Sequence, residues 1–307
     1  MGDPSGIGPA ITLKAVKALK GKADFVVIGD DWVLNRISKI QKLGKGSRFI
    51  DLNNVARNNF ATGIIKAEYG KASIEYLDKA MELINKREID CLVTSPISKE
   101  AVIKAGFKVS GHTEYFLKKC GLNEVVMMLL NDALRFSLVT RHIPLKDVSA
   151  QLSADKLYNN IIMTNQSLKD LFGIRNPRIG VCSLNPHASE NGLIGKEENR
   201  IIKPVLRKLS AGINVSGPLS SDVAVLKAYQ GEFDCLIALY HDQALIPLKL
   251  TGHETGINMT LGLPFIRTSP LHGTAFDIAK NPGKADPSSL IAAIKLAIKC
   301  ALTQKRA

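Results

Sequence analysis

The stretch CLIALYHDQALIPLK, residues 235–249, passes from an apolar run directly into three consecutive polar side chains. The run at 234–240 has the length and composition of a buried strand, and it leads without a break into His241, Asp242 and Gln243. In open α/β sheets, ligands bind beyond the carboxyl ends of the strands, where a rigid edge presents polar groups. The stretch therefore predicts a buried strand whose end carries site residues.

Similar apolar runs alternate with helical periodicity along the whole chain. Strands are expected at 25–30, 90–95, 125–130, 134–140, 178–183, 234–240 and 256–261. Helices are expected at 10–20, 67–86, 98–105, 113–120, 153–172, 196–208, 219–229 and 286–302. Strands that alternate with helices imply an α/β protein with a largely parallel sheet covered on both faces. Because 307 residues exceed what one core usually serves, one large or two closely joined domains are expected.

The composition is that of a globular chain, with 45% hydrophobic and 22% charged residues. No apolar run reaches the roughly 18 residues that a membrane span needs. The N-terminal MGDPSGIGP has neither the basic nor the apolar region of a signal peptide. We therefore expect a cytoplasmic protein with no membrane partner.

The charge distribution argues against a nucleic-acid-binding protein, and the cysteines argue against a disulfide-bonded one. Lys and Arg exceed Asp and Glu by 41 − 28 = 13, but the lysines are spread along the chain and aromatic residues make up only 6%. This pattern favours a lysine-rich surface, and no nucleic-acid partner is expected. The five cysteines are odd in number, include no C-x-x-C pair and mostly fall in apolar runs, as reduced core cysteines do.

Three of the six histidines, His142, His187 and His241, come just after predicted strands. Their shared context suits a three-imidazole site for Zn²⁺ or a similar divalent ion, although each could also cap a helix or bond within a loop. His112, in GHTEYF, begins a predicted helix, where unpaired N–H groups suit an anion. The alternative is that His112 or Thr113 only caps that helix.

Other signals concern phosphate. The segment GDPSGIGP is glycine-rich but is not G-x-G-x-x-G, and there is no G-x-x-x-x-G-K-[ST], so neither a dinucleotide fingerprint nor a P-loop is indicated. Lys249 and Arg267 are cations flanked by apolar residues, and Asn258 lies between them in sequence. These three are candidate ligands for an anionic small molecule.

Eight blocks of the chain, taken in order, resemble one family. They are GDPSGIGP, VTSPISKEA, GHTEYF, RHIPL, SLNPHASENGLIGKEE, YHDQALIPLK, GINMTLGLPFIRTSPLHGTAFDIA and KADPSSL. Together they are similar to 4-hydroxythreonine-4-phosphate dehydrogenase, the NAD-dependent enzyme of pyridoxal phosphate biosynthesis, across nearly the whole sequence.

The resemblance implies an isocitrate/isopropylmalate dehydrogenase-like fold, with two α/β/α domains, an interdomain cleft and a mostly parallel sheet. The domains expected are 1–108 plus 256–307 on the cofactor side, and 109–255 for metal binding and dimerisation. A homodimer is implied, with an active site shared between its subunits.

The same resemblance implies the site residues. A divalent metal, Zn, Mg or Co, would be held by His142, His187 and His241, with one ligand from the neighbouring subunit. Substrate would contact His112, Thr113, Lys249, Asn258 and Arg267. NAD or NADP would lie beside His272, Gly273, Thr274, Ala275 and Asp277.

The implied reaction oxidises 4-phosphohydroxy-L-threonine to 2-amino-3-oxo-4-phosphobutanoate, which loses CO₂ to give 3-amino-2-oxopropyl phosphate. Asp242 and Lys249 are the candidates for the general base, and Asp242 could equally orient a ligand imidazole. The chain departs from the family pattern at Ala10, where Glu is usual, and in AKNPGKAD at 279–286. It also begins at Met1, where the family has a short strand before GDP, so an unpaired sheet edge is expected there.

Three alternatives stay open. A paralogous dehydrogenase of threonate or erythronate 4-phosphate would use the same metal and phosphate residues. A three-histidine metal hydrolase would act without nicotinamide. A non-catalytic binding protein would bind ligand without His241.

Overall fold

The computed structural model describes residues 1–37, 46–109 and 111–306, and its chain forms two compact units. Unit 1 comprises Met1–Asn123 and Leu263–Ala301, and unit 2 comprises Glu124–Gly262 and Leu302–Ala307. The unit borders therefore fall at 123/124 and 262/263, where the sequence suggested 108/109 and 255/256. One consequence is that His112 and Thr113 lie in unit 1. The cofactor and metal roles assigned to the two domains stay predictions.

Unit 1 contains two parallel strand pairs, β1 with β2 and β3 with β10. Its elements are α1 (Gly8–Ala18), β1 (Val26–Gly29), α2 (Asp31–Ile37), β2 (Arg48–Asp51), α3 (Ala67–Asn85), β3 (Cys91–Val93), α4 (Lys99–Lys104), α5 (His112–Lys119), β10 (Ile266–Pro270), η5 (Pro282–Lys284) and α11 (Ser288–Gln304), whose last turn passes into unit 2.

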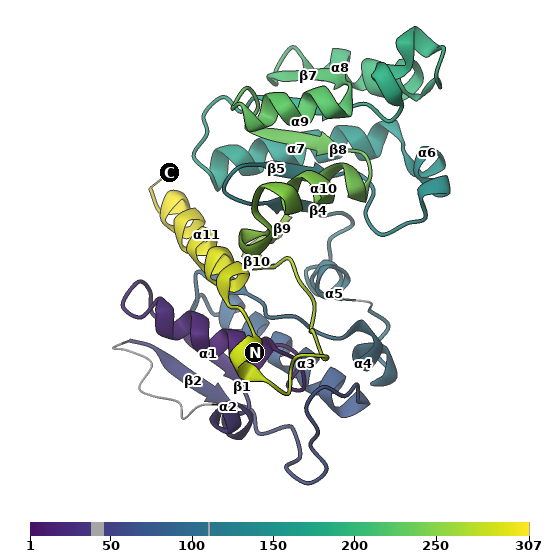
Figure 1. The fold of residues 1–307 in the computed structure, drawn as a ribbon. Coiled ribbons are helices and arrows are strands. Elements are labelled where there is room, and N and C mark those ends of the chain that lie inside the picture. The colour runs from purple at the N-terminus through teal and green to yellow at the C-terminus, as the bar shows by residue number, and fades with distance from the viewer. Residues whose placement is uncertain (38–45, 110, 307) are drawn as a thin grey trace. The chain divides into compact units, whose positions relative to one another are not determined.

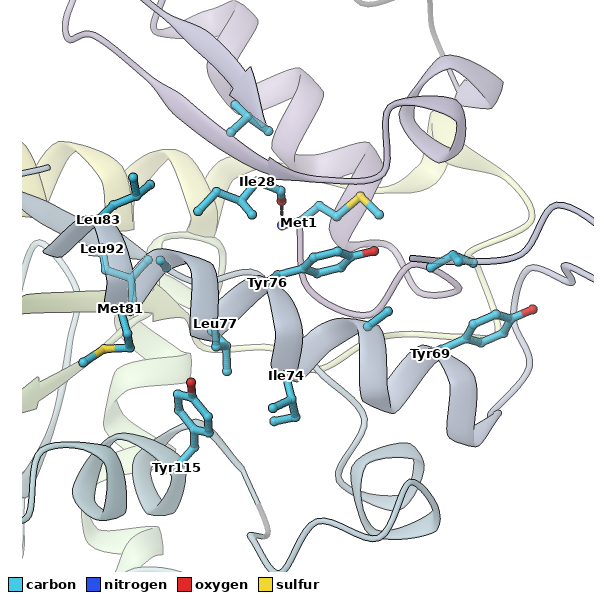
Figure 2. Close-up of a cluster of buried hydrophobic side chains, with 14 of the residues drawn as sticks. Met1, Ile28, Tyr69, Ile74, Tyr76, Leu77, Met81, Leu83, Leu92 and Tyr115 are labelled. Carbon is cyan, nitrogen blue, oxygen red and sulfur yellow. Dashed lines mark hydrogen bonds between the residues drawn. The ribbon is translucent and has the colours of Figure 1, made fainter. Parts of the chain in front are cut away.

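The core of unit 1 is built around α3. This helix buries Ile74, Tyr76 and Leu77 among other apolar side chains, and its long apolar face is what the sequence periodicity predicts. Figure 2 shows these side chains together with Met1 and Leu92. The first residues of the chain are part of this packing rather than a free end.

The N-terminal segment bonds to two neighbouring strand ends. The Met1 amine donates to the Ile28 carbonyl at 2.7 Å, and the Asp3 amide donates to the Pro96 carbonyl at 2.9 Å. These bonds connect the end of β1 with the segment that follows β3. Residues 1–3 thus form hydrogen bonds near the place where the sequence predicted an unpaired edge.

Unit 2 contains adjacent strands in the order β9-β4-β5-β8-β6-β7. Its helices and strands are drawn in teal to green in Figure 1. Strands β5, β8, β6 and β7 are mutually parallel, and β4 pairs antiparallel with both β5 and β9. Its elements are β4 (Val126–Leu130), β5 (Arg135–Leu138), η1 (Leu145–Asp147), α6 (Val148–Gln151), α7 (Ala154–Asp170), β6 (Ile179–Cys182), η2 (Pro186–Gly192), η3 (Glu198–Ile202), α8 (Lys203–Leu209), β7 (Val215–Leu219), α9 (Ser221–Tyr229), β8 (Cys235–Ala238), α10 (His241–Gly252), η4 (His253–Thr255) and β9 (Ile257–Leu261).

The connections of unit 2 place helices on both faces of its sheet. The crossovers through α7 and α8 advance toward β7, whereas α9 and α10 return in the opposite direction. Because crossovers between parallel strands are right-handed, the two pairs of helices cover opposite faces. The predicted α/β class with a mostly parallel sheet is confirmed.

Every predicted strand overlaps an observed one, but three strands and three α-helices (α2, α6 and α10) were missed. β2, β7 and β10 have the sequences RFID, VSGPL and IRTSP, whose polar residues, glycine and proline hide the strand pattern. The helices α2 and α10 follow strands without a turn signal. The helix predicted at 196–208 is confirmed, and its first part, Glu198–Ile202, is a π-helical turn that leads directly into α8. No helix among the residues described is long and apolar enough to cross a bilayer.

Candidate functional site

The four parallel strands of unit 2 end at one edge of the sheet, and polar residues follow each of them. Hydrogen bonds continue past the strand ends, from the Thr140 amide to the Leu239 carbonyl and from the Ser183 amide to the Leu219 carbonyl. The residues after β5, β6 and β8 are therefore held in register. This edge carries His142, His187 and His241, as the sequence predicts.

Gln243 explains part of the polar run that follows β8. Its buried amide accepts from the Leu239 amide at 2.7 Å and donates to the Ser183 carbonyl at 2.7 Å and to Ser221 Oγ at 2.9 Å. One side chain thus connects the ends of β8 and β6 with the start of α9. Gln243 is a structural residue, which leaves His241 and Asp242 for chemistry.

His142 and His241 lie next to each other at this edge. Their ring centroids are 5.5 Å apart and the rings are inclined at 50°. Nδ1 of His241 is 2.7 Å from Oδ1 of Asp242. A carboxylate on Nδ1 favours the tautomer that carries a lone pair on Nε2, the arrangement commonly seen behind metal-binding histidines. The donor set of this pair therefore fits a divalent cation that prefers imidazole nitrogen.

His187 is exposed in η2, near the start of α9. Its proximity contributes a little to the low pKa of Asp222, which is lowered mainly by hydrogen bonds from Ser220 and from the Val223 amide. Within the described residues, no group of three or more His, Cys, Asp or Glu side chains is placed to hold a metal ion. One chain alone therefore brings two of the three predicted imidazoles together.

Unit 1 holds a buried cation, Arg267, on β10. Arg267 is only 2% exposed, and its Nη2 and Nε donate to Thr94 Oγ1 at 2.7 and 3.2 Å. Its Cζ lies 5.9 Å from the centre of the Phe116 ring. Burial lowers the pKa of Arg267 to about 9, so the guanidinium remains charged at neutral pH. A desolvated cation of this kind is a strong site for a phosphate or carboxylate.

His112 belongs to the same cluster. It begins α5, as the sequence predicts, and its ring lies 6.3 Å from that of Phe116. Burial, followed by the charge of Arg267, holds the pKa of His112 well below its usual value, so the imidazole is neutral. Its Nε2 is buried and has no hydrogen-bond partner. An unpaired nitrogen beside a buried guanidinium suits a polar ligand. The neighbouring Thr113 is buried.

The other two predicted substrate residues are in unit 2. Lys249 is exposed on α10, about two turns after His241, and Asn258 lies on β9 opposite Leu129. The predicted substrate set is thus divided between the units, with His112, Thr113 and Arg267 in unit 1. Within unit 1, the structure places His112 and Thr113 close to Arg267.

The predicted cofactor loop packs on the glycine-rich N-terminal segment. The Ile7 amide donates to the Thr274 carbonyl at 2.9 Å, and a Cβ on Gly6 would lie 2.9 Å from the same oxygen. Lys14 Nζ donates to the Gly283 and Ala285 carbonyls. The remaining cofactor candidates are His272, half-buried with an unpaired Nε2, together with Gly273, Ala275 and Asp277. GDPSGIGP therefore supports this loop, a role that the sequence did not indicate.

Asp3 is a buried acid that sequence reasoning missed. Its Oδ2 is buried without a partner, and Oδ1 accepts from the Ser5 amide at 2.9 Å. Burial raises the pKa of Asp3 to about 6, against the opposing effect of backbone hydrogen bonds from Ser5, Gly6 and Ser98. The signal in the sequence that could have identified it is the position of this aspartate inside the glycine-rich segment GDPSGIGP.

The fold is that of an α/β protein with two neighbouring imidazoles at a sheet edge of unit 2 and a buried arginine in unit 1. Residues 11–297 match the family described as Pyridoxal phosphate biosynthetic protein PdxA. The chain belongs to this PdxA family.

Known relatives carry two different names. The chain is 42% identical to 4-hydroxythreonine-4-phosphate dehydrogenase of Sulfurihydrogenibium sp. (strain YO3AOP1), over 97% of this chain and 96% of the relative. It is 39% identical to D-threonate 4-phosphate dehydrogenase of Pectobacterium atrosepticum, over 98% of both. The crystal structure of 4-hydroxythreonine-4-phosphate dehydrogenase from Klebsiella pneumoniae superposes with a TM-score of 0.89 at 35% identity, covering 98% of this chain and 96% of that one.

Proposed function

We propose that the protein is a dehydrogenase that oxidises the secondary hydroxyl of 4-phosphohydroxy-L-threonine. The product, 2-amino-3-oxo-4-phosphobutanoate, is a β-keto acid and loses CO₂ to give 3-amino-2-oxopropyl phosphate. Family membership and the names of the relatives support the reaction class. The observation that carries the proposal is the His142–His241 pair with Asp242 behind it at the sheet edge.

The metal is proposed to bind the imidazoles of His142, His187 and His241. Because the three do not converge within one chain, we propose that two copies of the chain complete the set as a homodimer. A divalent cation held there would act as a Lewis acid that lowers the pKa of the substrate alcohol. Zn, Mg and Co are the ions considered, and imidazole donors favour Zn or Co over Mg.

The anionic groups of the substrate are proposed to contact Arg267 and Lys249, with His112, Thr113 and Asn258 completing the set. Arg267 is desolvated and already hydrogen-bonded to Thr94, so its guanidinium is held in place before the ligand arrives. His112 is neutral, and its unpaired Nε2 can exchange a hydrogen bond with a substrate hydroxyl, amine or phosphate.

The nicotinamide cofactor, NAD or NADP, is proposed to lie beside the loop from His272 to Asp277 and to accept the hydride. The support is the packing of this loop on GDPSGIGP through the Ile7–Thr274 hydrogen bond. Lys14 Nζ donates to the Gly283 and Ala285 carbonyls and so holds the segment that follows this loop.

Of the two candidates for the general base, Asp242 is better placed to orient His241, because its Oδ1 is 2.7 Å from Nδ1 of that ring. Lys249 is exposed and is retained as the candidate that takes the hydroxyl proton.

D-Threonate 4-phosphate is the second candidate substrate. It has the phosphate and secondary alcohol that the proposed residues would bind, and a D-threonate 4-phosphate dehydrogenase is 39% identical to this chain. The two substrates differ at the carbon next to the carboxylate, where one has an amine and the other a hydroxyl.

The test is an assay of purified protein that follows reduced nicotinamide by its absorbance. Each substrate is offered with NAD and with NADP, before and after removal of divalent metal. The proposal expects 4-phosphohydroxy-L-threonine to have the higher kcat/KM, with activity lost on chelation and restored by Zn²⁺ or Co²⁺. A higher kcat/KM for D-threonate 4-phosphate would establish the second candidate. Phosphate release without nicotinamide would indicate a hydrolase, and ligand binding without turnover would indicate a binding protein.

A further inference from the structure

We propose that Glu198 and Asn199 are positioning residues for His187, holding the unusual backbone turn that presents its imidazole. This inference rests on the proposed metal-binding role of His187. It assigns a task to the GKEE end of the SLNPHASENGLIGKEE block, which the proposed reaction leaves without one.

The turn that carries His187 is left-handed. Five consecutive residues other than glycine have positive φ, from 42° to 65° (His187, Ala188, Ser189, Glu190 and Asn191). Each such residue is unfavourable, because its Cβ approaches the following carbonyl oxygen, and runs of this kind are rare. A conformation of this type persists only where its surroundings impose it, and it is found preferentially at functional sites.

Glu198 holds the start of the turn. Its side chain is fully buried, and Oε1 accepts from the Leu184 and Asn185 amides at 2.9 and 2.8 Å. Oε2 accepts from Asn185 Nδ2 at 2.9 Å. Three donors from the two residues before Pro186 thus converge on one carboxylate, and Pro186 leads directly into His187.

Asn199 holds the end of the turn. Its Nδ2 donates to the Asn191 carbonyl at 3.0 Å, and the Ile194 amide donates to the Ser189 carbonyl at 3.0 Å. Adjacent residues of η3 therefore bond to both ends of the left-handed turn. Gly195 packs against the Asn185 side chain at the start of the turn, because a Cβ on Gly195 would lie only 2.4 Å from Asn185 Nδ2.

The geometry also shows why Gln cannot replace Glu198. An amide at position 198 would place an NH₂ group against Asn185 Nδ2, so two donors would face each other. Rotating the Asn185 amide does not help, because the same Nδ2 also donates to Glu197 Oε2 at 2.8 Å. Glu198→Gln therefore breaks the start of the turn with almost no change in volume.

The experiment measures Co²⁺ binding to the full-length, metal-free protein by calorimetry and by the visible absorption of the bound ion. Glu198→Gln is expected to lower Co²⁺ affinity about 10- to 100-fold, the usual effect of losing a group that orients a metal ligand. Glu232→Gln is the matched control, because Glu232 is an exposed glutamate of unit 2 paired with Lys227, and it is expected to bind Co²⁺ like the wild type. Asn199→Ala, which removes an exposed side chain, tests the other end of the turn if Glu198→Gln does not fold.

A double-mutant cycle separates positioning from general stability. If Glu198 acts through His187, the effect of Glu198→Gln on Co²⁺ affinity disappears in a His187→Ala background. Suppose that His187→Ala itself weakens Co²⁺ binding. The inference is then overturned if Glu198→Gln lowers Co²⁺ affinity equally in both backgrounds, or if neither Glu198→Gln nor Asn199→Ala lowers it. If His187→Ala binds Co²⁺ as tightly as the wild type, the proposed metal site itself is wrong, and the inference is overturned with it.

Discussion

Arg267 has a buried guanidinium, and we predict that it binds an anionic group of the substrate. Its neighbours include Thr94 and the face of Phe116; burial lowers its pKa, and the charge of Glu114 acts in the opposite direction. Removing a cation from water costs free energy, and replacing a buried charge by an apolar side chain of similar size is often neutral or stabilising. A bound phosphate or carboxylate would offset much of that cost of desolvation.

We therefore expect Arg267→Met to leave the melting temperature unchanged or raise it, while raising KM for the phosphorylated substrate at least ~10-fold. Thermal melts and steady-state kinetics on the same preparation measure both. Arg178→Met, at an exposed arginine paired with Asp234, should leave KM unchanged. A large fall in melting temperature with an unchanged KM would contradict the assigned role.

The buried carboxyl of Asp3 makes the free energy of unfolding depend on pH. Its pKa is raised from 3.8 to about 6 in the native protein, so between these values the folded chain holds a proton that the unfolded chain releases. The unfolded state thus binds fewer protons, and this group makes the free energy of unfolding fall as pH rises through that window. The difference of about 2 pKa units corresponds to roughly 3 kcal/mol once Asp3 is ionised.

Asp3→Asn should abolish this term while keeping the acceptor for the Ser5 amide. We expect the variant to gain stability relative to the wild type as pH rises from 4 to 6.5, by up to about 3 kcal/mol. Denaturant unfolding at a series of pH values measures the difference. A constant difference across the series would show that Asp3 titrates normally.

Between elements, the closest approach described is that of α3 and α4 in unit 1. A Cβ on Gly70 of α3 would lie 2.1 Å from the Ala101 carbonyl oxygen and 2.5 Å from the Val102 nitrogen, both backbone atoms. Only a residue without a side chain allows the two helices to pack in this way. Ser98 caps α4, and Thr94, four residues earlier, accepts from Arg267.

Gly70→Ala should therefore destabilise the protein by more than about 2 kcal/mol, although alanine in an exposed helix usually stabilises by up to about 1 kcal/mol. The control is Gly212→Ala, where a Cβ meets nothing within 4 Å. Chemical denaturation of both variants gives the comparison. A Gly70→Ala variant as stable as the control would mean that α4 moves away at little cost.

At the scale of the whole molecule, the predicted homodimer can be tested by complementation. His187→Ala and His241→Ala should each be inactive alone. If each site takes His241 from one subunit and His187 from the other, a mixed dimer of these variants restores one of its two sites. Random reassortment makes half of the dimers mixed, so about a quarter of wild-type activity is expected.

The measurement mixes the two variants after partial unfolding and refolding, with each refolded alone as its own control. The His142→Ala variant, unfolded and refolded alone in the same way, gives the background activity. Activity that stays at background in the mixture would place His187 and His241 of each site on one chain, or show that the site takes no part in the reaction.

The sequence by itself determined the α/β class, all seven predicted strands and the position of the three histidines after strand ends. These features depend on local patterns of apolar and polar residues, which a single chain displays directly. The start of α5 at His112 was equally local, because a glycine precedes a helical run.

Only the tertiary structure decided which of these residues meet. His142 and His241 are neighbours because β5 and β8 pair, whereas His187 depends on a left-handed turn that the pattern would not favour. The buried surroundings of Arg267 and the packing of GDPSGIGP against Thr274 join segments far apart in the chain. Strand pairing, burial and unfavourable φ values arise from contacts between distant residues, and for that reason they are not visible in any one stretch of sequence.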